Sequence, residues 1–362
     1  MPRVREGESV NQSAPFEHEA QRFLPPFPWF GGKSRAAHLI WPRFGAADNY
    51  VEPFFGSGAV LFSRPDAPGT ETINDKDRYV ANFWRAIQSD PAAVAASANW
   101  PVNECDLEAR HQWLVTAGKT KLENTLTDPH AFDAEIAGWW AWGLCAWIGS
   151  GWCSGEGPWR VNGGVWLRNA GQGVNRQLPH LGDAGKGVNR KLPHLGDAGK
   201  GTSARHHEHL LLYFQSLSDR LRYTRICCGD WRRVLTPSVT FRHGKTAVLL
   251  DPPYGEGELD YTAGGNRDMT ALDARAWAIE NASNPDLRIA LCGYDGQFEM
   301  PDDWTIAEWS AAGGYSSTAA EETQGQLNRH RERIWFSPNC ISAESDPQGL
   351  LFCTESELPD TD

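Results

Sequence analysis

The tetrapeptide Asp251-Pro252-Pro253-Tyr254 has the residue types that chemistry on a planar amine requires. Asp251 directly follows the apolar run 246–250, which predicts a strand buried on both faces, and ligands of α/β sheets bind where such strands end. The two prolines leave backbone carbonyls outside regular structure, and Tyr254 offers a ring for stacking. Acceptors on both N–H bonds would free the lone pair of an exocyclic amine to act as a nucleophile. A Pro-rich turn after a strand fits these four residues equally well, so other motifs must decide.

A glycine turn earlier in the chain indicates a nucleotide-like cofactor. Residues 51–58 read Val-Glu-Pro-Phe-Phe-Gly-Ser-Gly, between an expected strand and a helix expected to start just after the turn. Phe54, Gly56 and Gly58 therefore lie in the turn itself. Asp75 ends the next expected strand, 17 residues after Gly58, close to the spacing at which an acid binds ribose hydroxyls in dinucleotide folds. A single Gly-x-Gly turn is a weak signal, so its value lies in this downstream acid.

The segment Trp29-Phe30-Gly31-Gly32-Lys33-Ser34 ends like the phosphate-binding loop Gly-x-x-x-x-Gly-Lys-Ser. That motif needs glycine at position 27, where this chain has phenylalanine, so a nucleotide triphosphatase is excluded. Trp29 and Lys33 are left as an aromatic ring and a cation that precede the glycine turn.

In this order the motifs resemble those of the Dam-like family, the α class of DNA adenine-N6 methyltransferases. That family has Trp-x-Gly-Gly-Lys, Glu-Pro-Phe-x-Gly-x-Gly, an Asn-Asp pair, an insertion that recognises the target, and Asp-Pro-Pro-Tyr. This chain has the same series, with Asn74-Asp75 as the pair. The resemblance covers about residues 25–95 and 225–340, and the five tryptophans in 139–152 resemble segments of phage-borne members.

The resemblance implies a site-specific enzyme, of the kind found in restriction–modification systems, that transfers a methyl group from S-adenosylmethionine to N6 of adenine. The target base would leave the duplex, because its N6 is otherwise stacked and paired. By position, the cofactor-binding residues would be Trp29, Lys33, Phe54, Gly56, Gly58, Asp75, Asp230 and Asp251. The catalytic residues would be Asp251, Pro252, Pro253 and Tyr254. Asp75 would bind the ribose hydroxyls of the cofactor, and Asp230 its adenine amine.

The elements that would position these residues alternate between strands and helices. This alternation predicts an α/β fold with a doubly wound, mostly parallel sheet, the type found in class I S-adenosylmethionine-dependent methyltransferases. Expected strands lie at residues 50–54, 71–75, 223–227, 246–250, 288–291, 305–309 and 333–336. Expected helices lie at 34–41, from about 59, at 79–87, within 137–152 and at 209–221. The tryptophan-rich helix is expected to form the core of a second lobe.

Composition divides the chain into tails, one catalytic and cofactor-binding domain in two pieces, and a largely helical and irregular insertion that recognises DNA. The ranges are 1–22 and 342–362 for the disordered tails, 23–95 and 223–341 for the domain, and 96–222 for the insertion. Residues 173–200 contain a 14-residue unit twice with one difference. Two Gly- and Pro-rich units cannot build a core, so we expect a flexible surface loop in which one copy is dispensable.

The net charge of −12 is distributed unevenly. Residues 160–233 hold 13 Lys and Arg against 5 Asp and Glu, and this local positive excess predicts binding to the phosphates of double-stranded DNA. A solvated, charged insertion is the alternative. The chain has no apolar run long enough for a membrane span and no Cys-x-x-Cys pair. We therefore expect a cytoplasmic protein without a metal site or an obligatory protein partner.

Two other functions stay open. A methyltransferase acting on cytosine N4, an RNA base or a protein glutamine would present the same acceptors to its planar amine or amide. A catalytically silent DNA-binding protein would also carry the basic insertion. Analysis of methylated nucleosides tests the first alternative, and a cofactor titration tests the second.

Overall fold

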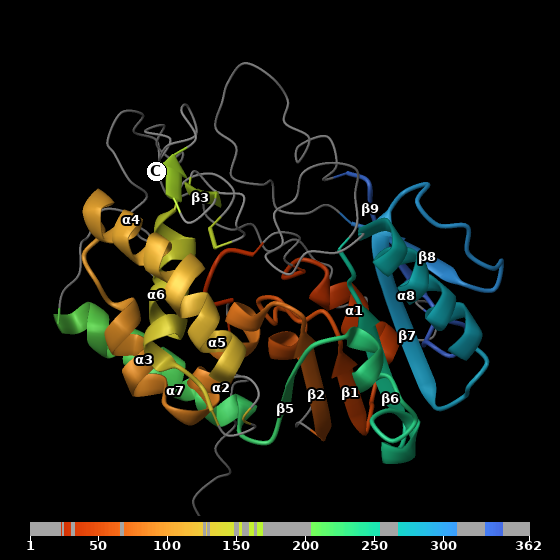
Figure 1. The fold of residues 1–362 in the computed structure, drawn as a ribbon. Helices are drawn as coiled ribbons and strands as arrows, with labels where there is room; N and C mark the ends of the chain where they lie inside the picture. The colour runs from red at the N-terminus through yellow and green to blue at the C-terminus, as the bar shows by residue number, and fades with distance from the viewer. Residues whose placement is uncertain are drawn as a thin grey trace, which may run out of the picture.

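The computed structural model describes residues 23, 25–29, 33–65, 69–125, 128, 131–147, 152–153, 159–162, 165–168, 204–253, 267–309 and 330–342. Seven strands form one sheet in the order β5-β2-β1-β6-β7-β9-β8 (Figure 1). Their bounds are β1 (Asn49–Glu52), β2 (Thr70–Asp75), β5 (Arg225–Cys228), β6 (Thr246–Leu250), β7 (Leu287–Tyr294), β8 (Thr305–Glu308) and β9 (Glu332–Phe336). Neighbours from β5 to β7 are parallel, whereas β9 is antiparallel to β7 and β8. The expected α/β fold with a mostly parallel sheet is confirmed.

The centre of the sheet is buried on both faces. Every residue of β1 and β6 is buried, which is what apolar runs such as Thr-Ala-Val-Leu-Leu require in a parallel sheet. The strand predicted at 246–250 is confirmed residue for residue, and β7 continues to Tyr294, three residues past its predicted end. The long β7 carries the sheet from its parallel part to its antiparallel edge.

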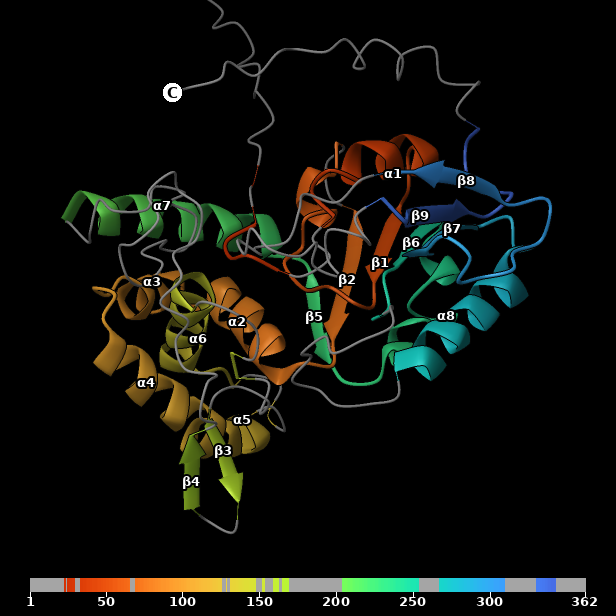
Figure 2. The same ribbon diagram turned by 90° about the horizontal axis from the view of Figure 1, so that it is seen from above.

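Helices cover both faces of the sheet. Helices α1 (Ala37–Phe44) and α8 (Arg267–Asn281) lie on opposite sides of β7 (Figure 2). Helix α2 (Arg78–Ser89) follows β2 and begins where the Asp77 carboxylate accepts a hydrogen bond from the backbone N–H of Tyr79. The sheet and its covering helices thereby place β2 and β6, the strands that end on the predicted acids, in the interior of the fold.

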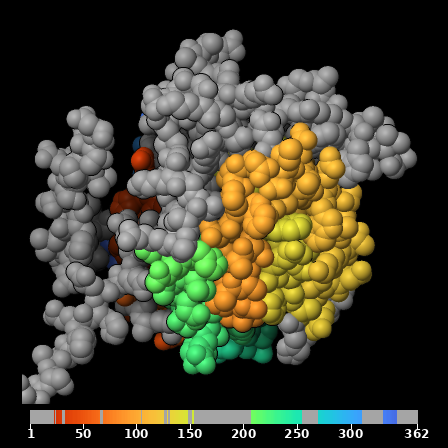
Figure 3. Space-filling view, turned by 90° about the vertical axis from the view of Figure 1, so that its left-hand side faces the viewer, coloured from red at the N-terminus to blue at the C-terminus, as the bar shows by residue number. Residues whose placement is uncertain are grey.

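A helical lobe extends from α2, away from β7–β9 (Figure 2). Its elements are α3 (Pro91–Ala98), α4 (Glu104–Trp113), a π-helical turn η2 (Leu114–Gly118), α5 (Lys119–Thr125), α6 (Ala134–Ala146) and α7 (Ala204–Leu221). Helix α6 packs closely on α3 at Gly138, where a Cβ atom would lie 2.4 Å from Cβ of Ser97. Figure 3 shows α7 beside the helices of this lobe on one face of the molecule.

Arg110 and Trp142 are buried in the lobe, and the rings of Trp100 and Trp139 also contact the guanidinium. The Arg110 guanidinium carbon lies 5.0, 5.0 and 4.4 Å from the ring centroids of Trp100, Trp139 and Trp142. Arg110 is 8% exposed and makes no ion pair with any described residue. The buried tryptophan-rich helix predicted within 137–152 is confirmed as α6, and it carries Trp139 and Trp142.

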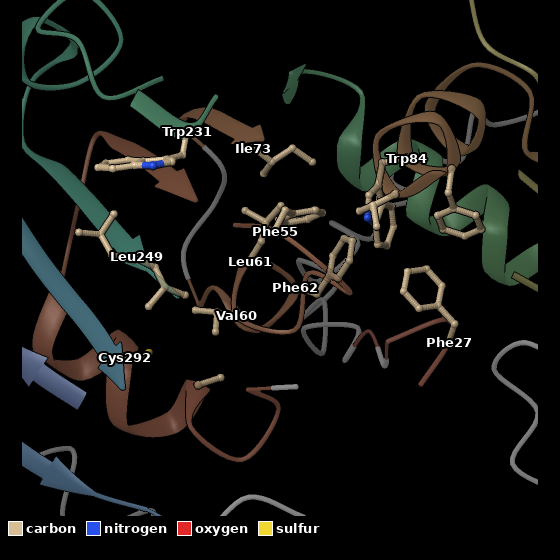
Figure 4. Close-up of a cluster of buried hydrophobic side chains, with 14 of the residues drawn as sticks. Phe27, Phe55, Val60, Leu61, Phe62, Ile73, Trp84, Trp231, Leu249 and Cys292 are labelled. Carbon is tan, nitrogen blue, oxygen red and sulfur yellow. The ribbon is translucent and has the colours of Figure 1, made fainter. Parts of the chain in front are cut away.

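Aromatic side chains also join the lobe to the sheet. The ring of Trp84 on α2 lies 5.3 Å from the rings of both Phe55 and Phe62, and 6.0 Å from that of Phe27 (Figure 4). These residues come from the segment before α1, the glycine turn and α2. The turn predicted to hold the cofactor is therefore fixed from below by a continuous apolar core.

The helix expected to start near Ala59 is wrong. That segment contains only the short 3₁₀ helix η1 (Leu61–Ser63), because Gly58 has a φ of 73° and the indole N–H of Trp41 binds the carbonyl of Val60 at 2.7 Å. The sequence also did not reveal the antiparallel hairpin of β3 (Trp159–Asn162) and β4 (Val165–Arg168). No described helix combines the length and apolar character that a membrane crossing requires.

Candidate active site

Three neighbouring strands end on acidic residues at the same edge of the sheet. β1 ends at Glu52, β2 ends at Asp75, and Asp251 follows the last residue of β6. The three strands are adjacent and parallel, in the order β2-β1-β6, so their carboxyl ends meet. The carboxyl edge of a parallel sheet is where α/β proteins bind their ligands.

Lys33 and Asp251 form a largely buried ion pair at this edge. The ammonium nitrogen lies 2.9 Å from Oδ2 of Asp251, and the two side chains are 4% and 19% exposed. The ring centroid of Trp309 lies 5.4 Å from the same nitrogen. Burial by itself lowers the pKa of Lys33, but the carboxylates of Asp251 and Glu332 outweigh it and raise that pKa above its ordinary value. Lys33 is therefore a permanent cation beside the predicted catalytic carboxylate.

A second carboxyl group, Glu52, lies behind this pair. Glu52 is 4% exposed, and its Oε2 accepts a 2.8 Å hydrogen bond from the hydroxyl of Tyr50. Burial raises the pKa of Glu52 well above its ordinary value, although the Tyr50 hydrogen bond opposes the shift. Glu52 thus favours the neutral form, so Asp251 rather than Glu52 is the charged ion-pair partner of Lys33.

The glycine turn after β1 is held open by tryptophans. Gly56 has a φ of 50°, and a Cβ atom there would lie 2.3 Å from the indole nitrogen of Trp29. The indole N–H of Trp84 donates to the carbonyl of Gly56 at 2.9 Å. At Gly58 a Cβ atom would lie 2.6 Å from the ring of Phe55. The turn therefore needs glycine at both positions, for its conformation and for the rings that pack against it.

Asp75 faces this turn from the end of β2. Its two carboxylate oxygens accept backbone hydrogen bonds from Gly56 at 2.9 Å and from Asp77 at 2.8 Å. Burial and the neighbouring Asp77 nevertheless raise the pKa of Asp75 to about 7. The carboxylate can accept further hydrogen bonds, and donors placed against it would favour its charged form.

The comparison with known protein families decides what this edge serves. Residues 29–113 match the family model for D12 class N6 adenine-specific DNA methyltransferases. The chain carries a D12 class N6-adenine DNA methyltransferase domain. The match includes Lys33, the glycine turn and Asp75, whereas Asp251 lies beyond it. A comparison with curated proteins found no match.

The seven-stranded sheet with an antiparallel β9 is typical of class I methyltransferases. It agrees with the family match, which covers β1, β2, α2 and α3. DNA is accordingly the substrate of the methyltransferase. The match does not bear on the phage-borne origin that the tryptophan-rich segment predicts.

Asp230, a predicted cofactor residue, makes its contacts within its own loop. It precedes the 3₁₀ helix η3 (Trp231–Val234), and its Oδ1 caps that helix by accepting from the backbone N–H of Arg232. Its Oδ2 lies 3.2 Å from the Arg232 guanidinium. Phe54 packs nearby, with its ring 5.7 Å from that of Trp231. Binding of a cofactor amine by Asp230 stays a prediction, as do the other assigned roles.

Asn74 joins the two loops that flank Asp75. Its buried amide donates to the carbonyl of Pro53 at 3.0 Å and to that of Gly229 at 3.1 Å. The backbone N–H of Gly229 in turn donates to the carbonyl of Asp75 at 3.1 Å. The sequence marks Asn74 only as the partner of Asp75 in a motif; its bridging role depends on a contact made far along the chain.

The remaining predicted residues lie differently in the methyltransferase. Pro252 is buried and Pro253 is half-buried, directly after Asp251. Tyr254, the repeat at 173–200, the tail 1–22 and most of the tail 342–362 lie outside the described residues. Within the described part of the chain, no three His, Cys, Asp or Glu side chains are grouped to hold a metal ion.

Proposed function

We propose that this methyltransferase transfers a methyl group from S-adenosylmethionine to N6 of an adenine turned out of double-stranded DNA at a specific sequence. The observation that carries the proposal is the placement of Asp75 and Asp251 at strand ends on one edge of the sheet, with Lys33 paired to Asp251. Asp75 lies on the side of the glycine turn, and Asp251 lies two strands away, about 10 Å across the sheet. That separation divides the edge into a cofactor side and an amine side.

The cofactor side fits a nucleoside with a charged sulfonium. Asp75 offers carboxylate oxygens to ribose hydroxyls, and the rings of Trp29 and Phe55 pack against the glycine turn that Asp75 faces. Trp29 and Phe54 are half-buried rings at the same turn. We assign Trp29, Lys33, Phe54, Gly56, Gly58, Asp75, Asp230 and Asp251 to the cofactor site. When bound, S-adenosylmethionine supplies an activated methyl group, so this chemistry requires no metal.

The amine side would act by hydrogen bonding and alignment. The Asp251 carboxylate would accept one N6–H of the adenine and the Pro252 carbonyl the other, with Pro253 fixing the backbone and Tyr254 stacking on the base. Two acceptors favour a pyramidal nitrogen, whose lone pair then points at the methyl group. As the N–C bond forms and the S–C bond breaks, N6 loses one proton toward the Asp251 side.

The insertion at 96–222 would recognise the DNA, with 23–95 and 223–341 as the catalytic domain. Among its described parts, the β3–β4 hairpin at residues 159–168 projects from the lobe (Figure 2). Not every basic residue of 160–233 is available to phosphates, because Arg220 binds both carboxylate oxygens of the buried Glu71, at 2.7 and 2.8 Å. Helix α7 is part of the core, so deletion of the whole basic segment would also remove core side chains such as Phe214 and Leu217.

The test uses unmethylated double-stranded DNA, labelled S-adenosylmethionine and digestion of the product to nucleosides. We expect N6-methyladenine from the wild-type chain, and at least a thousandfold less from Asp251→Ala with DNA affinity retained. Asp286→Ala, an exposed aspartate just before β7, serves as the matched control and should keep full activity. Methylcytosine as the product, or full activity of Asp251→Ala, would refute the proposal.

A further inference from the structure

Glu332 is a buried carboxylate that the proposed chemistry leaves without a role. It is 4% exposed and begins β9, which lies between β7 and β8 in the antiparallel part of the sheet. In the register of β7 and β9, Glu332 lies opposite Tyr294, and Ile334 lies opposite Cys292. Residues two apart on a strand share a face, so Glu332, Tyr294 and Cys292 lie on the same face of the sheet.

The pairing of β6 with β7 places Asp251 beside Cys292, close to this group of residues. Leu250 at the end of β6 pairs with Leu291 of β7, so Asp251 follows at the level of Cys292. Cys292 pairs with Ile334 of β9, and Glu332 lies two residues, about 7 Å, along β9 from Ile334. Asp251 and Glu332 therefore approach the same buried region from two strands that flank β7.

Lys33 pairs with Asp251, and Trp309 contacts both Lys33 and the backbone of Glu332. The Lys33 ammonium binds Asp251 at 2.9 Å and lies under the Trp309 ring at 5.4 Å. The backbone N–H of Trp309 donates to the carbonyl of Glu332 at 3.4 Å. The carboxyl groups of Asp251 and Glu332 both raise the pKa of Lys33 and so favour its charged form. Lys33 thus has Asp251 as an ion-pair partner and the carboxyl group of Glu332 nearby, from two different strands.

This arrangement matters because Asp251 would have two partners, Lys33 and the adenine amine. In the proposed reaction Asp251 accepts an N6–H of the adenine, yet without DNA it is the ion-pair partner of Lys33. A buried ammonium that loses its only counter-ion is strongly destabilised. A second carboxylate near the ammonium removes that difficulty, because Lys33 keeps an anion while Asp251 is drawn toward the amine.

We infer that Glu332 is a positioning residue for methyl transfer: from β9 it holds the charge of Lys33 in place while Asp251 is shared between Lys33 and the adenine amine. The inference rests on the proposed function, since it concerns the step in which Asp251 engages N6. Glu332 would act through Lys33 and would touch neither the adenine nor the methyl donor.

The test measures single-turnover methyl transfer by Glu332→Gln, which removes the charge and keeps the shape. We expect the rate to fall about ten- to a hundredfold, as when a buried charge loses one of two partners. The dissociation constants for S-adenosylmethionine and DNA should stay within about twofold of wild type. The matched control is Glu308→Gln, a carboxylate on β8 that is 78% exposed and should leave the rate unchanged.

Two further variants keep the test decisive if Glu332→Gln folds poorly. Glu332→Asp retains the charge and should recover most of the rate. In the Lys33→Met background, Glu332→Gln should have no additional effect, because the charge it holds is gone. Additive effects in this double-mutant cycle, or a wild-type rate for folded Glu332→Gln, would overturn the inference. If the wild-type chain itself methylates no adenine, the proposed function fails instead.

Discussion

Two buried cations in this methyltransferase are accommodated in opposite ways. Lys33 at the sheet edge pairs with the Asp251 carboxylate and has Glu332 nearby, whereas Arg110 in the helical lobe lies among three indole rings without an ion pair to any described residue. Burial lowers the pKa of Arg110, while carboxylates raise that of Lys33. Ring faces attract a cation weakly but fit its shape, and carboxylates attract it strongly with less demand on shape.

From this difference we predict that the sheet edge serves the reaction and that the lobe serves stability. An ion pair can be exchanged for another hydrogen bond when substrate arrives, because a carboxylate accepts from any donor. A guanidinium packed between rings has no such alternative and behaves as part of a core. Charge changes at the edge should therefore alter rate, and size changes in the lobe should alter the free energy of unfolding.

The largest effect is expected from Lys33→Met. The substitution leaves Asp251 without its cation, so the single-turnover rate of methyl transfer should fall about a thousandfold. Lys119→Met, an exposed lysine at the start of α5, is the control and should transfer normally. Near wild-type transfer by folded Lys33→Met would break the contrast between the two cations.

The lobe should respond most strongly to Gly143→Ala. A Cβ atom at Gly143 would lie 1.8 Å from the ring of Trp152, so the ring must move and the free energy of unfolding should fall by about 3 kcal/mol in urea titrations. Gly296→Ala separates packing from backbone strain, because its φ is 75° and nothing lies near its Cβ; it should cost about 1 kcal/mol. Equal losses from both variants would show that the ring contact has no weight.

Arg110→Met sharpens the comparison directly. Methionine keeps the apolar stem between the rings and removes the charge, so the free energy of unfolding should fall by only about 1–2 kcal/mol. Methyl transfer per folded molecule should be unchanged. A rate loss as large as that of Lys33→Met would mean that the lobe takes part in the reaction step.

The smallest effect concerns pH and Asp75. The pKa of Asp75 is raised to about 7, and ribose hydroxyls donating to the carboxylate would lower it on binding. Calorimetry should therefore show affinity for S-adenosylmethionine constant above pH 7 and falling by at most about tenfold per pH unit below it. Asp75→Asn should bind weakly and without this dependence; an unchanged pH profile in that variant would exclude Asp75 as its source.

The stability of the free chain should change with pH in the opposite direction. The raised pKa of Asp75 favours the folded state at low pH, and that contribution is lost as pH rises through about 7.

Local patterns in the sequence predict the parts of this molecule that depend on neighbouring residues. The run at 246–250 is apolar throughout and can only be a strand buried on both faces, and it is β6. The helix expected near Ala59 is wrong because the positive φ of Gly58 and a hydrogen bond from Trp41 decide the conformation there. The family match spans Lys33 and the glycine turn, whose roles at the site stay predictions.

The rest depends on contacts between distant positions. Glu332 sits in an ordinary strand sequence, and only the sheet register brings it to the side of Lys33. Arg110 looks like a solvated helical charge until Trp139 and Trp142 of a later helix enclose it. No local spacing encodes such pairs, so periodicity assigns these residues to elements but not to partners.

The contacts of the Asn74 amide also determine when the site can form while the chain is being synthesised. It bridges Pro53 and a carbonyl 155 residues further along, at Gly229. Until that residue leaves the ribosome, β2 lacks its outer neighbour β5 and the amide lacks its second acceptor. The glycine turn can form early, but the hydrogen bond from Asn74 to Gly229 requires the whole insertion, so a nascent chain would acquire this bridge only after residue 229 has been synthesised.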